Sequence, residues 1–313
     1  MGYFLGVDGG QTATVAAIGD AAGRVLGAGA GGPCNHVRGP GGRKKFVSAI
    51  QTALERACQA AGLDPKRIGF RAACLGFSGG PEDKRDIVAE LVRAERLLVT
   101  TDAVIALMGA TGGEPGVIVI AGTGSIAFGR NAAGRSARAG GWGYIFGDEG
   151  GAFDIVRQAL RAALRFEEGW GPATALHGAL LEATGAASAN ELLHLFYTRR
   201  YPRPRIAGLA PLVDETARRG DEMAVEILRQ AAQRLATYAA AVRRQLFRPE
   251  EPVAVAYIGG VFASAILRER FRTLVELEET ARVVAPRYRP EYGALIEAWR
   301  AAGLKPELQS PSS

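Results

Sequence analysis

Carboxylate, hydroxyl and paired glycine residues recur where short apolar runs of this chain end. The first group is Asp8-Gly9-Gly10-Gln11-Thr12, which lies between the apolar runs 3–7 and 15–18. This order is typical of a strand, a tight glycine turn and a return strand. Such a turn can present backbone N–H groups to an anion, and a nearby carboxylate suits the metal that accompanies a phosphate. An ordinary hairpin turn would use the same residues.

Further segments combine the same residue types. Asp102 follows the apolar run 97–101, where it could accept a proton from a hydroxyl group or simply cap the next helix. Gly122-Thr123-Gly124-Ser125 ends the apolar run 117–120 and forms a second turn that could bind phosphate. The remaining segments are Ser78-Gly79-Gly80, Gly140-Gly141-Trp142-Gly143, Gly147-Asp148-Glu149-Gly150-Gly151 and Gly259-Gly260.

The elements that would position these residues follow the order strand-strand-strand-helix-strand-helix-strand-helix twice, with extra helices inserted in the second half. In the first half we expect strands at 4–7, 14–18, 24–28, 72–77 and 97–101, and helices at 44–61, 82–93 and 103–108. In the second half the clearest elements are strands at 117–120, 126–129, 253–258 and 282–285, and helices at 206–219, 222–246 and 292–302.

This order predicts an α/β fold in which each half is a mixed sheet covered by helices. We expect an N-terminal domain at 1–112, a C-terminal domain with helical insertions at 113–289, and a disordered tail at 304–313. A helix at about 290–303 could pack back on the first domain. The two glycine turns occupy equivalent places in the two halves, which predicts a cleft between the domains for a nucleotide and a second substrate.

Composition excludes several classes of protein. Of the 313 residues, 48% are hydrophobic and 22% are charged, which is typical of a soluble globular protein. The net charge of +6 is spread along the chain, so we do not expect nucleic acid as a partner. No apolar run approaches about 18 residues, so we do not expect a membrane either. Three cysteines, Cys34, Cys58 and Cys74, have no metal-type spacing and favour reduced thiols in the cytoplasm.

In chain order, segments 7–12, 101–103, 121–125, 140–150 and 258–262 resemble the BadF/BadG/BcrA/BcrD ATPase family of the actin–hexokinase–Hsp70 superfamily. Its N-acetylglucosamine kinase and broad-specificity hexokinase branch is the most similar. The resemblance covers about residues 3–302 and implies two RNase-H-like domains that close on ATP, Mg²⁺ and a sugar. A homodimer is expected because it is the commonest assembly.

The resemblance also implies roles for single residues. Asp102 would deprotonate the 6-hydroxyl of the sugar, and Asp8 would hold Mg²⁺ through water. Residues that would contact ATP are Gly9, Gly10, Gln11, Thr12, Gly122, Thr123, Gly124, Ser125, Gly259, Gly260 and Val261. Residues that would contact the sugar are Asn35, Ser78, Gly79, Asp102, Thr123, Gly141 and Asp148.

Two positions depart from the pattern of the family. Ala13 stands where relatives often carry Lys, which removes a positive charge from the first phosphate turn. Val37 stands where the animal enzyme has an aromatic residue, which weakens the case for strict N-acetyl selectivity. Simpler roles also remain open: Asp148 could merely complement a helix dipole, and Trp142 is more typical of a packing aromatic than of a ligand.

The sequence thus predicts an ATP-dependent kinase for N-acetylglucosamine, glucosamine or a related hexose. The iron–sulfur activator ATPases of the same family need two cysteines in the second half, and no cysteine follows Cys74. A sugar-binding protein without catalysis and a polymerising protein also stay open as functions, because fold alone does not decide function.

Overall fold

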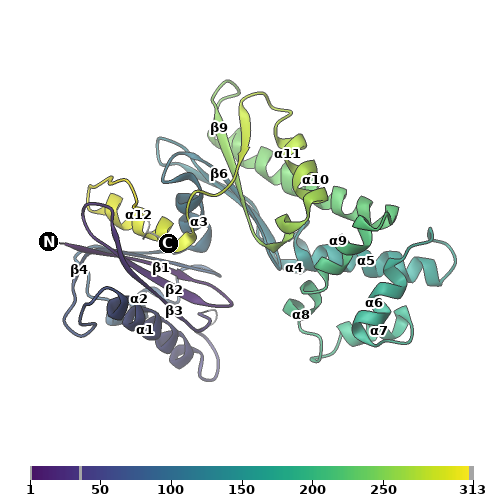
Figure 1. Ribbon diagram of the computed structural model, residues 1–313, viewed down its shortest axis with the longest axis horizontal. Coiled ribbons are helices and arrows are strands. Elements are labelled where there is room, and N and C mark those ends of the chain that lie inside the picture. The colour runs from purple at the N-terminus through teal and green to yellow at the C-terminus, as the bar shows by residue number, and fades with distance from the viewer. Residues whose placement is uncertain (1, 35–36, 310–313) are drawn as a thin grey trace. The chain divides into compact units, whose positions relative to one another are not determined.

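Two mixed β-sheets form the framework of the chain in a computed structural model, which describes residues 2–34 and 37–309. Within these residues the chain divides into two units (Figure 1). The first unit consists of Met1–Glu114 and Ala285–Ser313, and the second of Pro115–Val284. Each unit contains one five-stranded sheet of the described residues, which gives the two helix-covered mixed sheets that the sequence predicts.

The first sheet has the strand order β3-β2-β1-β4-β5. Its central strand β1 pairs antiparallel with β2 and parallel with β4, and β5 continues the parallel side. Three parallel neighbours therefore end at the same edge of the sheet. The strands are β1 (Tyr3–Gly9), β2 (Thr14–Gly19), β3 (Val25–Gly31), β4 (Phe70–Phe77) and β5 (Leu97–Thr101).

Helices cover both faces of this sheet (Figure 1). One face carries α1 (Gly42–Ala60) and α2 (Arg85–Leu91), and the other carries α3 (Asp102–Thr111) and α12 (Pro290–Ala301). Alternate residues of β1 serve the two faces, because Leu5 and Val7 join the core under α1 whereas Phe4 packs with Trp299 of α12. The helix expected at 82–93 is shorter than predicted, since it ends at Leu91.

The second sheet repeats this topology, with the order β10-β9-β6-β7-β8. Its central strand β6 pairs antiparallel with β7 and parallel with β9, as β1 does with β2 and β4. The predicted duplication of architecture is therefore present in the strand pairing. The strands are β6 (Gly116–Ala121), β7 (Ser125–Arg130), β8 (Ser136–Gly140), β9 (Val253–Ile258) and β10 (Ala281–Val284).

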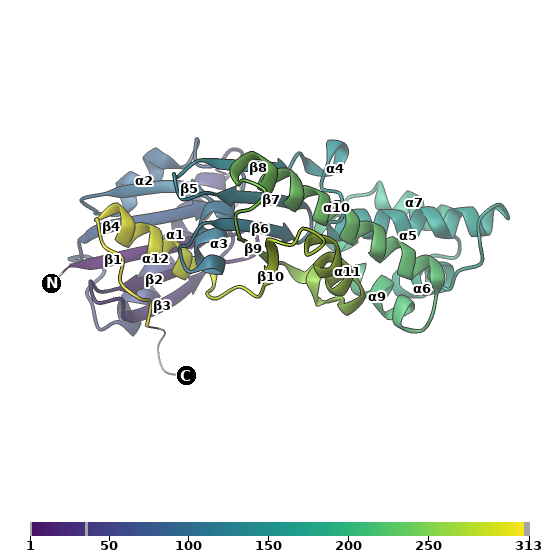
Figure 2. The same cartoon turned by 90° about the horizontal axis from the view of Figure 1, so that it is seen from above.

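The inserted helices lie between β8 and β9 in sequence. Figure 2 shows α5, α6, α7 and α9 grouped beyond one end of the second sheet, while α10 and α11 run along it. The single helix expected at 206–219 is wrong, because Gly208 and Leu209 separate α8 from α9. The helices are α4 (Gly143–Phe146), α5 (Ala152–Glu167), α6 (Leu176–Thr184), α7 (Ala189–Phe196), α8 (Arg203–Ala207), α9 (Ala210–Arg218), α10 (Glu222–Leu246) and α11 (Ala265–Val275), with the 3₁₀ turn η1 at Gly260–Ala263.

The end of the chain differs from the expected disordered tail. Leu308 is buried in the core of the first unit, and the amide of Gln309 donates to the carbonyl of Gly23 at 2.9 Å. An apolar side chain and a strand-like bridge therefore order residues 304–309, and residues 310–313 lie outside the described part. No helix within the described ranges is long and apolar enough to cross a membrane.

Gly293 sets how closely α12 packs on α3. A Cβ at Gly293 would lie 1.9 Å from the Ile105 carbonyl oxygen, whereas a Cβ at Gly178 of α6 would meet no atom within 4 Å. We expect Gly293→Ala to lower the free energy of unfolding by about 1–3 kcal/mol through overpacking. The control Gly178→Ala should raise it by up to about 1 kcal/mol, because alanine loses less entropy in a helix. Denaturant unfolding measures both, and a Gly293→Ala variant as stable as the wild type would contradict this packing.

Candidate active site

The carboxyl ends of β1, β4 and β5 bring three predicted residues to one edge of the first sheet. Asp8 lies near the end of β1, Ser78 follows β4, and Asp102 follows β5 as the first residue of α3. The Ser78 hydroxyl donates to Asp102 Oδ2 at 2.7 Å, and Asp102 Oδ1 accepts from the Ala103 amide at 2.9 Å. The carboxylate of Asp102 thus accepts a hydrogen bond within the first turn of α3. It is also oriented by the Ser78 hydroxyl, which follows the neighbouring strand β4. Gly79 lies in the adjoining turn with a φ of 77°.

Asp8 lies in a surplus of negative charge. Burial, followed by the carboxylates of Glu291 and Asp102, raises the pKa of Asp8 to about 7, against the opposing effect of the Arg289 guanidinium. Glu291 is only 2% exposed and pairs with Arg289 Nε at 2.9 Å. A group of carboxylates in which Glu291 is buried and Asp8 and Asp102 are half-buried, with one arginine beside it, favours a bound cation.

A magnesium ion fits at Asp8 if water and substrate phosphates supply most of its ligands. In the described residues no group of three or more His, Cys, Asp or Glu side chains is arranged to hold a metal. Mg²⁺ is usually bound by one or two carboxylates, with water and substrate phosphates completing its octahedron. Asp8 matches that requirement as a single carboxylate beside an exposed turn.

The first glycine turn owes its shape to close packing. A Cβ at Gly9 would lie 2.2 Å from the Phe77 ring, and the Gly10 amide donates to the Ala13 carbonyl at 3.0 Å. The turn residues Gln11, Thr12 and Ala13 are exposed. The glycines therefore serve the turn and the core, and the exposed residues remain available for a ligand. Asn35, predicted to contact the sugar, lies outside the described residues.

In the second unit, the Gly122–Ser125 loop is fixed to the start of α5. Gly122 and Thr123 accept hydrogen bonds from the Ala152 and Phe153 amides at 2.8 and 3.1 Å. A Cβ at Gly151 would lie 2.8 Å from the Gly124 carbonyl carbon, so only glycine allows this contact. The loop thus lies against the positive end of the α5 dipole, where a phosphate group is favoured.

Ser125 connects two other predicted segments, 140–143 and 147–151. Its amide donates to Asp148 Oδ1 at 3.3 Å, its hydroxyl donates to the Glu149 carbonyl at 2.6 Å, and its carbonyl accepts from the Gly141 amide at 3.0 Å. Asp148 is buried, has a φ of 61°, and its Oδ2 pairs with the Arg203 guanidinium. The structure therefore brings Ser125, Gly141 and Asp148 together, with Asp148 already bonded within its own unit.

Three residues near these groups were not predicted. Arg203 holds Asp148, the Tyr238 hydroxyl donates to the Glu149 carboxylate, and Glu291 faces Asp8. Burial and then the Glu149 carboxylate raise the pKa of Tyr238 above its usual range. None of these residues belongs to a motif, and the only signal in the sequence is an acidic residue directly after Pro290 at the start of a helix.

The expected packing role of Trp142 is wrong. Trp142 is 66% exposed, and the Arg138 guanidinium lies 4.8 Å from its ring centroid. It follows a left-handed glycine, Gly141, and directly precedes the one-turn helix α4, whose Ile145 and Phe146 are also exposed. This segment is too short to bury its apolar side chains against the second sheet.

Two predicted ATP segments line one pocket of the second unit. A cavity of about 700 Å³ is bordered by Gly122 and Thr123 on one side and by Gly260 and Val261 on another. Gly259 has a φ of 119°, and a Cβ there would lie 2.1 Å from the Ala121 carbonyl oxygen. This volume is in the range of small-molecule sites. The two loops are therefore arranged to contact the same ligand.

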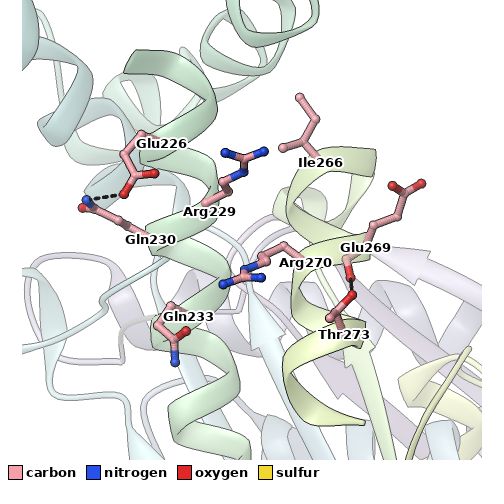
Figure 3. A pocket seen from close by; sticks show the side chains of 8 residues that line it. All are labelled: Glu226, Arg229, Gln230, Gln233, Ile266, Glu269, Arg270 and Thr273. Carbon is pink, nitrogen blue, oxygen red and sulfur yellow. Dashed lines mark hydrogen bonds between the residues drawn. The ribbon is translucent and has the colours of Figure 1, made fainter. Parts of the chain in front are cut away.

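A hollow of similar volume, about 670 Å³, lies between α10 and α11 (Figure 3). Its charged side chains are Glu226, Arg229, Glu269 and Arg270, all of them exposed. None of the predicted site residues lines it, and it has no glycine loop. The pocket at Gly122 and Gly260 is the better candidate for the nucleotide.

Comparison with known proteins decides the family. The model of the BadF/BadG/BcrA/BcrD ATPase family matches residues 5–298. The chain belongs to this family. The predicted family is thereby confirmed, as is the fold class of mixed, helix-covered sheets of the actin-like ATPase type.

Relatives match almost the whole chain. N-acetylmuramic acid/N-acetylglucosamine kinase of Clostridium acetobutylicum is 32% identical over 305 residues, 95% of this chain and 98% of its own. N-acetyl-D-glucosamine kinase of Dictyostelium discoideum is 30% identical over 310 residues, 94% of this chain and 97% of its own. A solved structure from Chromobacterium violaceum, provisionally described as an N-acetylglucosamine kinase, is 31% identical and has a TM-score of 0.76. The match covers 95% of this chain and 98% of the other.

The raised pKa of Asp8 has a consequence for stability. The folded pKa of about 7 lies above the ordinary aspartate value, so the folded chain holds a proton that the unfolded chain releases between about pH 4 and 7. Wild-type stability therefore falls as pH rises through this window. We expect Asp8→Asn to be more stable than the wild type by about 2 kcal/mol at pH 8, after allowance for partial exposure.

Unfolding in denaturant at pH 4.5 and pH 8, without divalent cations, measures this difference. The gain should shrink toward pH 4.5, because Asp8 is then largely neutral in the folded wild type. An Asp8→Asn variant that is less stable than the wild type at pH 8 would contradict the buried negative charge.

Proposed function

We propose that the chain is an ATP-dependent sugar kinase that phosphorylates the 6-hydroxyl of N-acetylglucosamine, glucosamine or a related hexose. The observation that carries the proposal is the Ser78–Asp102 hydrogen bond, which orients a carboxylate beside Asp8 at one edge of the first sheet. The names of the relatives and membership of an ATPase family support the same reaction.

Asp102 is the proposed general base. Phosphoryl transfer depends on positioning and charge neutralisation, with a residue that orients the attacking hydroxyl. Each carboxylate oxygen of Asp102 has a second lone pair, so the bonds from Ser78 and Ala103 leave room for a sugar hydroxyl. The sugar oxygen forms its bond to the γ-phosphorus as the bond to the β,γ-bridging oxygen breaks. The hydroxyl proton passes to Asp102, and ADP leaves with the bridging oxygen.

The remaining predicted residues would hold the two substrates. Gly9, Gly10, Gln11 and Thr12 of the first unit and Gly122–Ser125 of the second are proposed to contact the phosphates. Backbone N–H groups would make these contacts, except those of Gly10, Gly122 and Ser125, which donate within the protein. Gly259, Gly260 and Val261 would pack against adenosine, a role supported by the pocket that two of them line. Asp8 would hold Mg²⁺, whose charge, when bound, neutralises the phosphate oxygens.

The choice of sugar is proposed to depend on Ser78, Gly79, Thr123, Gly141 and Asp148, with Asn35. Asp148 is paired with Arg203 and bonded to Ser125, so a sugar hydroxyl would join an existing network. The names of the relatives give different sugars. They therefore support the hexosamine class as a whole more than any single sugar of that class. A cytoplasmic location and a homodimer remain predictions.

A role as an iron–sulfur activator finds no support. Its cluster would need exposed thiolates at an interface between copies. The three cysteines of the chain are all buried and precede residue 75. In contrast, the carboxylate pair at the strand ends is what a kinase needs.

Replacing Asp102 tests the proposal directly. We expect Asp102→Asn to lower kcat by about 10²–10⁴-fold, because the amide cannot accept the proton. The measurement is ADP release in a coupled assay over a panel of hexoses and hexosamines. Asp86→Asn in the exposed first turn of α2 is the matched control and should keep wild-type activity. ATP hydrolysis that does not depend on any sugar, or full activity of Asp102→Asn, would contradict the kinase assignment.

Ser78 should act through its hydroxyl. Ser78→Ala removes a hydrogen bond to a charged group, so we expect kcat to fall about tenfold while KM for ATP stays unchanged. Ser78→Thr retains the hydroxyl and should recover most of the lost activity. Equal losses in Ser78→Ala and Ser78→Thr would mean that the site depends on the size of residue 78 and not on its hydrogen bond.

A further inference from the structure

Asp148 has a backbone conformation that is unusual for a residue with a side chain. Its φ of 61° makes it the one non-glycine residue in the left-handed region among residues 2–34 and 37–309. The other left-handed positions of this segment are glycines, namely Gly140, Gly141, Gly143 and Gly150. A glycine at position 148 would relieve the strain, so the conformation points to a use for the carboxylate.

Two other elements hold the Asp148 carboxylate. Its Oδ2 pairs with the guanidinium of Arg203, the first residue of α8, and its Oδ1 accepts a hydrogen bond from the Ser125 amide at 3.3 Å. The Arg203 guanidinium carbon lies 5.1 Å from the ring centroid of Tyr144 and 5.8 Å from that of Phe153, within the range of cation–π contacts. The side chains of Asp148 and Arg203 remain 9% and 33% exposed. The pair is therefore fixed in orientation, and a ligand can reach its exposed part.

The same pair lies directly against the Gly122–Ser125 loop. A Cβ at Gly124 would lie 2.8 Å from Arg203 Nη2 and would overlap the Asp148 carboxylate, so the absence of a side chain at Gly124 makes room for the pair. An unpaired carboxylate this close to the loop would repel a phosphate bound there, because charges in a partly buried site interact strongly over several ångströms. The positive charge of Arg203 offsets this repulsion.

The helix that carries Arg203 also borders the candidate nucleotide pocket. Pro204 and Ala207 of α8 line the same cavity as Gly122 and Gly260. One short helix of the insertion thus contributes to the wall of that pocket and holds the carboxylate that is predicted to contact the sugar. Its first residue is therefore placed to affect both substrates.

We propose that Arg203 is a positioning residue with two effects. It orients the Asp148 carboxylate as an acceptor for a sugar hydroxyl, and it cancels the charge of that carboxylate beside the Gly122–Ser125 loop. This inference rests on the proposed function, because it assumes that Asp148 contacts the sugar and that the loop contacts the phosphates.

Replacing Arg203 by methionine removes the charge and keeps an apolar side chain of similar length. Calorimetry on the full chain, with magnesium present, measures the binding of ADP and separately of N-acetylglucosamine, glucosamine and glucose. We expect Arg203→Met to bind the best of these sugars about tenfold more weakly than the wild type, since the carboxylate loses its orientation. It should bind ADP about fivefold more weakly, since the charge of Asp148 is then uncompensated.

Two further variants separate charge from packing. In Arg203→Met combined with Asp148→Asn, the negative charge is removed as well, so ADP affinity should return to within about twofold of the wild type while sugar affinity stays low. Arg203→Lys keeps the charge but lacks the planar group that stacks on Tyr144 and Phe153, so it should bind ADP as the wild type does. A residue that only stabilised α8 would give no such recovery for one ligand alone.

Arg205 of the same helix provides a matched control. Its guanidinium carbon lies 4.2 Å from the Tyr201 ring centroid and its Nη1 donates to the Arg200 carbonyl at 3.0 Å, away from Asp148. Arg205→Met should therefore keep both affinities. Thermal unfolding checks that each variant is folded, and Arg203→Gln gives the same comparison if Arg203→Met does not fold.

Several results would overturn the inference. They are sugar affinity that is unchanged in the uncharged Arg203 variant, ADP affinity that stays low in the double variant or in Arg203→Lys, and equal losses in Arg205→Met. If the wild type phosphorylates a sugar but any of these results is found, the inference fails and the kinase proposal stands. If the expected changes in binding are found but no sugar is phosphorylated, the kinase proposal fails and the role of Arg203 stands. A wild type that binds none of the sugars would contradict both.

Discussion

The close contact of β1 with α12 is the constraint on which the first unit depends. A Cβ at Gly6 would lie 2.4 Å from the Glu291 carbonyl oxygen, so the strand and the helix approach to a distance that only glycine permits. Phe4 and Trp299 extend the contact along the same face. Asp8 follows on that face because side chains alternate along a strand. The packing that closes the sheet therefore also brings the start of α12 to the proposed metal-binding carboxylate.

This arrangement links stability to chemistry. Burial and the neighbouring carboxylates raise the pKa of Asp8 to about 7, and Arg289 opposes them only in part. The fold thus keeps a carboxylate in a position where its charge is unfavourable until a cation arrives. Polar groups held in this way are typical of functional sites, where local stability is given up for a ligand. In the second unit the equivalent loop is Gly122–Ser125. Its carbonyl groups at Gly122 and Thr123 accept hydrogen bonds from the Ala152 and Phe153 amides at the start of α5.

The sequence predicts the local features of this protein well and the distant contacts poorly. The glycine turns and the buried strands follow from residue patterns within a few positions, and the duplicated architecture follows from the order of strands and helices along the chain. The electrostatic interaction of Glu291 with Asp8 joins residues from opposite ends of the chain, and the pairing of Arg203 with Asp148 crosses the inserted helices. Such contacts leave no periodicity in the sequence. The break between α8 and α9 was missed because a glycine inside a helical pattern is often tolerated.

Ala13, where the resemblance leads us to expect a lysine, is best understood from the charges around Asp8. A lysine in the exposed turn would add one positive charge to a site where the Arg289 guanidinium offsets the carboxylates around Asp8 only in part. A divalent ion can neutralise the remaining negative charge. Because such an ion also binds the phosphates, their charge would be partly neutralised when they bind at the turn. Under the proposed function, the metal at Asp8 would therefore supply the positive charge that a lysine in this turn would add. Ala13 then costs affinity for the phosphates but leaves the orientation of the sugar hydroxyl by Asp102 and Ser78 unchanged.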